Sequence, residues 1–130
     1  MSTSGITHIP DFGTGATIST RQAGDVAIFD ISGRLTLGPA LTQLAGLIKV
    51  AIESGGRKIL LNLAEVTYID SSGIGELTGS MKLISGKGGE LKLLQASKRV
   101  QDLMRLVGVH PLFVFERDET EAFESFSTRP

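Results

Sequence analysis

The sequence predicts an α/β fold with a mixed, mostly parallel sheet of about four or five strands and about four helices. Short apolar runs alternate with segments in which apolar residues recur every three or four positions, a pattern typical of strands that alternate with amphipathic helices. Two β-prone runs flank a Gly-Asp turn near the start, which predicts an opening antiparallel hairpin. The chain has 130 residues, of which 41% are hydrophobic, and this size is typical of one domain.

Residues 1–15 contain mainly Ser, Thr, Gly and Pro with few large apolar groups, so we expect a flexible tail ahead of a domain over residues 16–130. The tail has no basic start followed by an apolar run and does not resemble a secretory signal. No stretch approaches the ~18–20 apolar residues that cross a bilayer. We therefore expect a cytoplasmic protein without membrane association.

The hairpin is predicted over residues 16–31, and Gly33 is expected to end its second strand. A helix is predicted to begin at Pro39, and its apolar residues fall on one face until Ser54-Gly55-Gly56 ends it. The apolar run over residues 59–63 is typical of a buried strand. Strand, helix and strand here form a crossover unit.

An apolar run over residues 66–69 leads into a second predicted helix, which begins at Ser71 or Ser72 and ends near Gly86. The alternation then continues to the end of the chain. The remaining elements are a strand over residues 90–94, a helix capped by Ser97 and ended by Gly108, a strand over residues 112–115, and a helix capped by Asp118 with Ala122, Phe123 and Phe126 facing inward.

The composition excludes several classes of function. The chain has no Cys, which removes disulfide frameworks, thiolate zinc sites, iron–sulfur clusters and cysteine nucleophiles. Its 13 basic and 14 acidic residues give a net charge of -1 with the basic residues scattered, so we expect no direct binding to nucleic acid. His8 and His110 have no second His at metal-ligand spacing, and we expect no metal and no cofactor.

Catalytic motifs are also absent from the sequence. It has no G-x-S-x-G, no P-loop and no G-x-G-x-x-G. The charged run from Glu116 to Glu121 is interpreted as the solvated face of the terminal helix. We therefore predict no catalytic residues and a protein that is not an enzyme.

The most informative segment is Asp70-Ser71-Ser72-Gly73-Ile74-Gly75, which places two hydroxyls and a carboxylate at the start of a helix. The backbone N–H groups there lack helical partners and the helix dipole favours negative charge, so a phosphate would be tolerated. The two glycines leave the first turn with little side-chain cover. The chemistry leaves three readings open: helix capping alone, a modification site, or a glycine-rich phosphate loop.

Three stretches together carry a resemblance to a known family. They are residues 60–63, residues 66–75 with their Asp-Ser-Ser-Gly, and residues 88–93 followed by Val100-Gln101-Asp102-Leu103-Met104. They resemble the STAS domain family, specifically the bacterial anti-sigma factor antagonists. The resemblance covers the chain from about Thr17 to Phe126 and implies a STAS-like domain.

The resemblance implies a function through protein partners. Members of the family bind an anti-sigma factor that is itself a serine kinase, and so free a sigma factor. Phosphorylation of the first serine of the motif blocks the binding, and a serine phosphatase restores it. By this resemblance Ser71 is the phosphoacceptor, and Ser72 is the second hydroxyl, the helix cap and the runner-up phosphoacceptor. Nothing in the sequence requires more than a monomer, so we expect a monomer or weak dimer.

The resemblance also implies a partner-binding surface. Its residues are Arg34, Thr36, Asp70, Ser71, Ser72, Gly73, Ile74, Gly75 and Leu77. We further expect some of Leu77, Met81, Ile84 and Leu106 to line an exposed apolar patch beside Ser71. Many relatives have Gly, any residue, Leu and Asp after the second strand, whereas this chain has Gly33-Arg34-Leu35-Thr36, so the local charge differs.

Two alternatives remain at this stage. One is a STAS scaffold or transport-associated module that is never phosphorylated. The other belongs to a different class: a domain that binds a small ligand or nucleotide, or an enzyme that uses Asp70 and Ser71.

Overall fold

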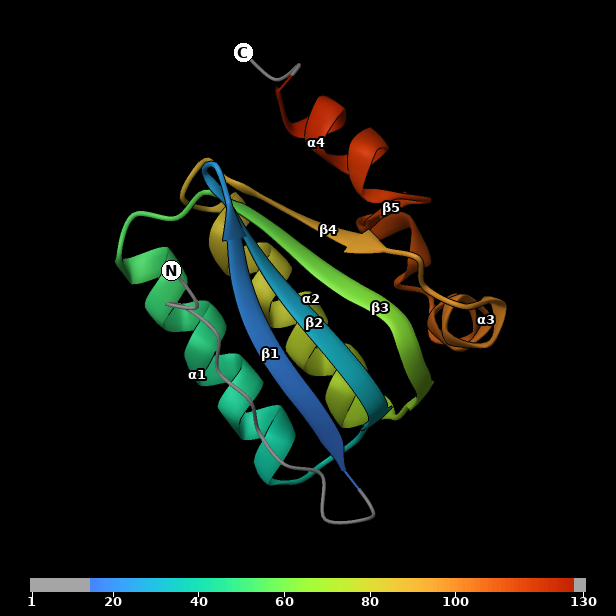
Figure 1. The fold of residues 1–130 in the computed structure, drawn as a ribbon. Helices are drawn as coiled ribbons and strands as arrows, with labels where there is room; N and C mark the ends of the chain where they lie inside the picture. The colour runs from blue at the N-terminus through green and yellow to red at the C-terminus, as the bar shows by residue number, and fades with distance from the viewer. Residues whose placement is uncertain (1–14, 128–130) are drawn as a thin grey trace.

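In the part of the chain that the structure describes, five strands form one sheet in the order β1-β2-β3-β4-β5 (Figure 1). The structure is a computed structural model that describes residues 15–127, so the predicted tail lies outside the described residues except for Gly15. Within these described residues only the β1–β2 pair is antiparallel, which confirms the opening hairpin and the mostly parallel sheet. The strands are β1 (Ala16–Ala23), β2 (Val26–Leu35), β3 (Lys58–Ile69), β4 (Glu90–Leu94) and β5 (Val114–Glu116).

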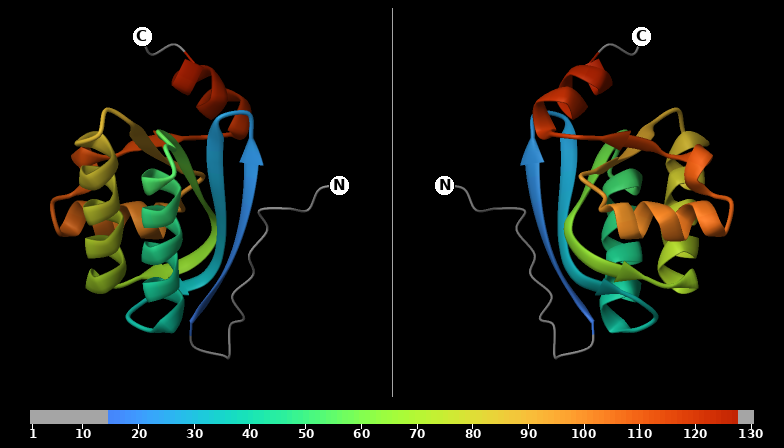
Figure 2. Two further views of the ribbon diagram at one scale, coloured as in Figure 1. Left: turned by 90° about the vertical axis from the view of Figure 1, so that its left-hand side faces the viewer. Right: turned by 90° about the vertical axis from the view of Figure 1, so that its right-hand side faces the viewer.

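Helices lie on both faces of this sheet. The two longest, α1 and α2, lie side by side on one face, and α4 packs at one end of the other (Figures 1 and 2). The helical elements are α1 (Pro39–Glu53), α2 (Ser71–Ser85), α3 (Lys98–Leu106), the short 3-10 helix η1 (His110–Leu112) and α4 (Glu119–Ser127). No helix within residues 15–127 combines the length and apolar character that crossing a membrane requires.

The alternation of β3 divides the core into two clusters. Ile59 and Leu61 pack toward α1 and α2, whereas Leu60 packs toward α4, and all three are fully buried. Complete burial of such a side chain contributes about 1.5–3 kcal/mol. Leu44 of α1 and Leu77 of α2 are also fully buried in the larger cluster. The central strand is therefore apolar on both faces because both are covered.

The register between β2 and β3 shifts twice, between Asp30 and Ser32 and again between Gly33 and Arg34. Gly33 has φ 97°, a left-handed conformation that glycine adopts without a Cβ penalty. The sequence predicted that Gly33 would end the strand, but β2 continues to Leu35 because the irregularity lies inside the strand. After the second shift, Leu35 pairs with Ile69 at the edge where α2 begins.

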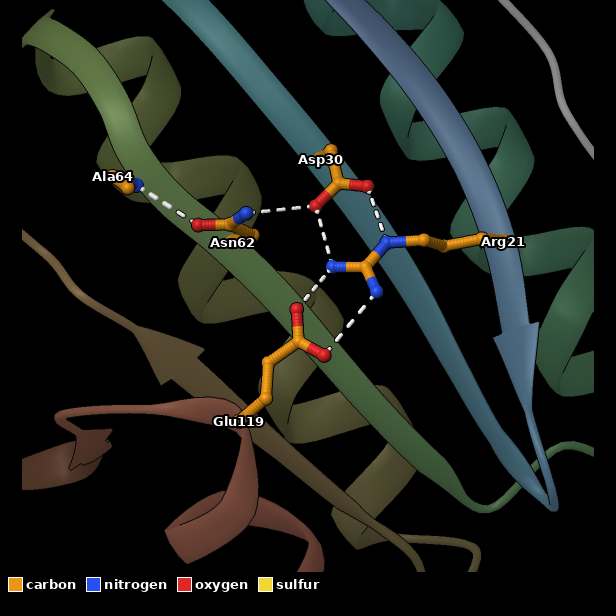
Figure 3. A network of polar contacts seen from close by, with 5 residues as sticks. All are labelled: Arg21, Asp30, Asn62, Ala64 and Glu119. Carbon is orange, nitrogen blue, oxygen red and sulfur yellow. Dashed lines mark hydrogen bonds and ion pairs between the residues drawn. The ribbon is translucent and has the colours of Figure 1, made fainter.

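A polar network ties α4 to the sheet (Figure 3). The Arg21 guanidinium donates to Asp30 at 2.6 and 3.0 Å and to both carboxylate oxygens of Glu119, one of them at 3.2 Å. Asn62 donates to the same Asp30 carboxylate at 2.7 Å. Hydrogen bonds from the Arg21 guanidinium lower the pKa of the Asp30 carboxyl group. The pKa of Arg21 is raised, first by its hydrogen bonds to Asp30 and second by those to Glu119. Glu119 was predicted on a solvated face and instead anchors the helix.

A second charged contact beneath α4 is buried. Lys92 Nζ lies 3.5 Å from Glu116 Oε2, and the two side chains are only 3% and 10% exposed. The same ammonium group donates to the Ser125 hydroxyl and lies 4.6 Å from the centre of the Phe126 ring. The prediction of a solvated face is therefore wrong for Glu116 as well, since the carboxylate partners a lysine distant in sequence.

Most helix ends lie where the sequence predicted them. Ser97 Oγ accepts from the Val100 amide, and Asp118 Oδ1 accepts from the Glu121 amide. The last strand is shorter than predicted, because Leu112 belongs to η1 and β5 begins at Val114. His110 is half-buried, stacks on Phe115 and hydrogen-bonds Gln101, so it has a packing role.

We expect Lys92→Met to lower the free energy of unfolding by about 3 kcal/mol, because the substitution leaves the Glu116 carboxylate buried without a counter-charge. Urea titration measures this loss. The double variant Lys92→Met/Glu116→Leu should recover most of it, and Lys98→Met, at a side chain that is 88% exposed, should have little effect. Equal losses for Lys92→Met and Lys98→Met would contradict a stabilising role for the buried pair.

Candidate functional site

The site begins where β3 ends and α2 starts. Asp70 follows the strand in an extended conformation, and its Oδ1 accepts from the Gly73 amide at 2.9 Å. Asp70 is therefore the N-cap of α2, and the prediction that Ser72 is the cap is wrong. Ser72 lies inside the first helical turn, whereas an N-cap precedes the helix with a non-helical backbone.

The same carboxylate also holds the loop between β2 and α1. Asp70 Oδ2 accepts from the Leu37 amide at 3.1 Å, and the Asp70 amide donates to the Leu35 carbonyl at 3.3 Å. Partial burial acts to raise the pKa of Asp70, but hydrogen bonds from the amides of Gly73, Leu37 and Ser72 outweigh it and lower that pKa. An ionised carboxylate therefore joins two segments that lie more than thirty residues apart.

Gly73 packs against the ends of both neighbouring strands. A Cβ at this position would lie 2.3 Å from the Leu35 carbonyl oxygen and 2.7 Å from Ile69 Cγ1. The residue is buried, so its small size serves packing within the chain, and the prediction that it contacts a partner is wrong. Gly75 differs, because it is exposed and a Cβ there would meet no atom within 4 Å.

The two serines of the motif differ in exposure. Ser71 is exposed at the first position of α2, and Ser72 is half-buried. The Ser71 hydroxyl makes no hydrogen bond with any residue in the described part of the chain. Ser71 therefore offers the more accessible hydroxyl, at the positive end of a helix dipole.

A shallow groove of about 440 Å³ runs from Ser71 along the outer side of α2. One wall is α2 itself, and the other is the segment that comes directly after the end of α3. The lining residues are Ser71, Ile74, Gly75, Thr78, Gly79 and Lys82 from α2, with Val107 and Val109 opposite. The lining combines small residues with apolar ones and a single cation, so a segment of another protein can approach the helix closely.

Some predicted partner residues do not reach the surface. Leu77 and Ile84 are fully buried in the core, so the prediction of Leu77 in the partner surface and of both residues in the exposed patch is wrong. Ile74 is also a core residue at 7% exposure, so it offers a partner little of its surface. Met81 is half-buried and Leu106 is 82% exposed on α3, but neither lines the groove at Ser71. The helical period that brings Leu77 to the core leaves Gly75 and Gly79 outside.

Arg34 and Thr36, which the sequence predicted in a loop after the second strand, lie beside the site, but Arg34 belongs to the end of β2 and only Thr36 lies in the loop. Thr36 is half-buried, and Arg34 is exposed with its guanidinium 4.7 Å from the centre of the Tyr68 ring. Leu37, Val107 and Val109 also belong to the site, although no sequence motif marks them. Each reaches the site through a contact between distant segments, and no local pattern signals such a contact.

Among residues 15–127 no group of three His, Cys, Asp or Glu side chains is placed to hold a metal ion. A comparison with known proteins gives the family. The model of the STAS domain matches residues 17–122. The chain belongs to the STAS domain family.

Relatives within the STAS family carry regulatory names. The anti-sigma-B factor antagonist of Staphylococcus aureus is 36% identical over 70 residues, which cover 53% of this chain and 65% of that protein. The match thus spans just under two-thirds of the relative's length.

Two solved structures of SpoIIAA share the STAS fold with this chain. The unphosphorylated anti-sigma factor antagonist has a TM-score of 0.75 at 23% identity, covering 87% of this chain and 98% of that chain. The Bacillus cell fate determinant SpoIIAA in its phosphorylated form has a TM-score of 0.67 at 24% identity, covering 83% and 97% respectively. At these identities the likeness establishes the fold.

We expect Gly73→Ala to lower the free energy of unfolding by at least about 2 kcal/mol, because the new methyl group would lie 2.3 Å from the Leu35 carbonyl oxygen and the backbone would have to shift. Gly75→Ala is the matched control in the same helical turn. It should raise stability by about 0.5–1 kcal/mol, since the helix gains a better former and no clash. Denaturant titration of both variants tests this, and similar stabilities would disprove the close packing.

We expect part of the acid sensitivity of the fold to come from Asp70. Its pKa is lowered in the folded chain, so its carboxylate stabilises the fold above the unfolded-state pKa of about 3.9, and this contribution is lost as pH falls through the folded-state pKa. The stability difference between wild type and Asp70→Asn should be constant near neutral pH and shrink below about pH 4. Unfolding titrations from pH 7 to 3 measure it, and a difference that grows on acidification would contradict the assignment.

Proposed function

We propose that this chain is an anti-sigma factor antagonist controlled at Ser71. With a free Ser71 hydroxyl it binds an anti-sigma factor serine kinase and so frees a sigma factor. Phosphorylation of Ser71 ends the binding, and a serine phosphatase restores it. The observation that carries the proposal is the exposed Ser71 hydroxyl at the end of the α2 groove, in a motif whose Asp70 and Gly73 are engaged within the chain. The names of the relatives and of the phosphorylated SpoIIAA structure support it.

The groove accounts for the binding of the unmodified chain. Val107 and Val109 supply apolar surface, and Gly75 and Gly79 allow a partner's backbone to approach. Ser71 at one end is neutral, so a partner can cover it at low desolvation cost. The groove is lined on α2 by the residues that follow the motif, so the motif and docking surface are continuous.

A phosphate on Ser71 changes this balance locally. It adds about -1.5 to -2 charges beside the Asp70 carboxylate, which its amide hydrogen bonds keep ionised. Covering such a dianion with a partner that offers no counter-charge costs several kcal/mol. The same phosphate is tolerated in the free chain, because it lies in water at a helix N-terminus. The switch therefore needs no rearrangement of the fold.

The proposal gives the chain no catalytic step. Both oxygens of Asp70 accept backbone amides, and His110 bonds Gln101, so neither is placed as a base for Ser71. Other proteins carry out the transfer and removal of phosphate. This role places the chain in the cytoplasm, as a monomer or weak dimer.

The test is phosphorylation by the anti-sigma factor kinase from the same organism, with the modified residue located by mass spectrometry. Wild type and Ser72→Ala should each gain one phosphate, and Ser71→Ala should gain none. Isothermal titration should then show that phosphorylation weakens kinase binding by about 100-fold or more, the equivalent of roughly 3 kcal/mol. Circular dichroism should be unchanged.

Two results would overturn the proposal. One is phosphate on Ser72 instead of Ser71. The other is equal affinity of the kinase for the free and phosphorylated chain. A thermal shift with ATP or GTP in the absence of any kinase would instead favour the nucleotide-binding alternative, since a ligand of the folded state raises the melting temperature.

A further inference from the structure

Two arginines gather around one tyrosine near the end of β3 that leads to Ser71. The Arg34 guanidinium carbon lies 4.7 Å from the centre of the Tyr68 ring, and that of Arg99 lies 5.4 Å from it. Arg34 comes from the end of β2 and Arg99 from the first turn of α3, and both are exposed. These distances are typical of cation–π contacts, which orient both guanidinium groups without neutralising them. We call this set the Arg34–Tyr68–Arg99 cluster.

Neither arginine of the cluster has an ion-pair partner among residues 15–127. Neighbouring cations on the same helix do, because Lys98 and Arg105 both pair with Asp102. The segment 33–37 contains no acidic residue, and the nearby Asp70 carboxylate is held by backbone amides. Two uncompensated positive charges therefore share one ring, so an arriving anion gains attraction from both.

Apolar surface adjoins the cluster on α3. A shallow hollow of about 610 Å³ is lined by Lys98, Arg99, Asp102, Leu103 and Leu106. Leu106 is 82% exposed, and Arg99 belongs to both the hollow and the cluster. A ligand that fits this surface carries negative charge next to an apolar group, which is the chemistry of an acidic protein segment and not of a free inorganic anion.

The cluster also lies close to Ser71. Tyr68 precedes Ser71 by three residues, so their Cα atoms lie at most about 11 Å apart. A standard interface covers about 800 Å² on each partner, which is wide enough to include both. A partner seated at Ser71 thus reaches the cluster without a second binding event.

We propose that the Arg34–Tyr68–Arg99 cluster and the α3 hollow bind an acidic segment of the kinase that docks at Ser71. Carboxylates of that segment contact the two guanidinium groups, and an apolar side chain covers Leu106. This inference rests on the proposed function and adds the chemistry of the partner. Because the arginines are exposed, the contribution is electrostatic, acts strongly on the association rate and weakens with salt.

The test is titration of the kinase with Arg34→Gln and Arg99→Gln at low and high salt. Each variant should lose about tenfold in affinity at low salt and much less at high salt. Arg105→Gln is the matched control, because it removes the same charge from α3 at a residue that pairs with Asp102, and it should stay within about twofold of wild type. Leu106→Ala should weaken binding at both salt concentrations, since its contact is apolar.

The outcomes separate this inference from the proposed function. If wild type does not bind the kinase at all, the proposed function fails and the inference fails with it. If wild type binds the kinase, two results overturn only the inference. One is that Arg34→Gln and Arg99→Gln both bind within twofold of wild type, and the other is that all three arginine variants lose affinity equally. The last probe is inorganic phosphate, titrated at constant ionic strength and followed by the side-chain NMR signals of Arg34 and Arg99. If phosphate shifts these signals while neither glutamine substitution changes the kinase affinity, the cluster binds a small anion and the inference is overturned.

Discussion

One carboxylate, that of Asp70, holds the site in place. It caps α2 through the Gly73 amide and fixes the β2–α1 loop through the Leu37 amide, while the Asp70 amide closes the junction on Leu35. Gly73 then lets α2 begin in contact with both strand ends. The exposure of Ser71 follows from this arrangement, because the residue after an N-cap starts the helix at its open, solvent-facing end. A different cap would rotate the first turn and move the hydroxyl.

The sequence predicts the elements well where the signal is local. Strand alternation, helical period and the caps at Ser97 and Asp118 all depend on neighbours within a few positions, and the structure agrees with them. It predicts poorly where the partner is distant. Glu119 was predicted to face solvent, because its partner Arg21 is 98 residues away in the sequence. Leu77 was predicted to face a partner, because the sequence does not show which side of the helix packs on the sheet. The cap itself was assigned to Ser72, since Asp and Ser are equally good caps and only the helix start decides between them.

Net charge is a poor guide to the electrostatics of this chain. The net charge of -1 is the sum over two different electrostatic environments, one around α4 and one near Ser71. Around α4, charges are paired and partly buried, as in the Arg21–Asp30–Glu119 network (Figure 3) and the Lys92–Glu116 pair, and they hold the helix on the sheet. Near Ser71, the two arginines on Tyr68 are exposed and without ion pairs among the described residues. Paired charges stabilise one structure, whereas unpaired exposed charges are available to a partner.

On the proposed function, this division allows phosphorylation of Ser71 to act on binding without acting on the fold. Asp70 and Gly73 define the junction, and the Ser71 side chain takes part in none of their contacts, so the proposal expects these contacts to persist when Ser71 is phosphorylated. On the two proposals together, a phosphate opposes the partner twice. It places a dianion at the end of the groove, and the Cα atom of Ser71 lies at most about 11 Å from that of Tyr68, so at low salt, where screening is weak, the phosphate also offsets part of the positive potential of the two arginines. Both effects lower affinity for an acidic partner, so a modification of one exposed hydroxyl is sufficient for the switch.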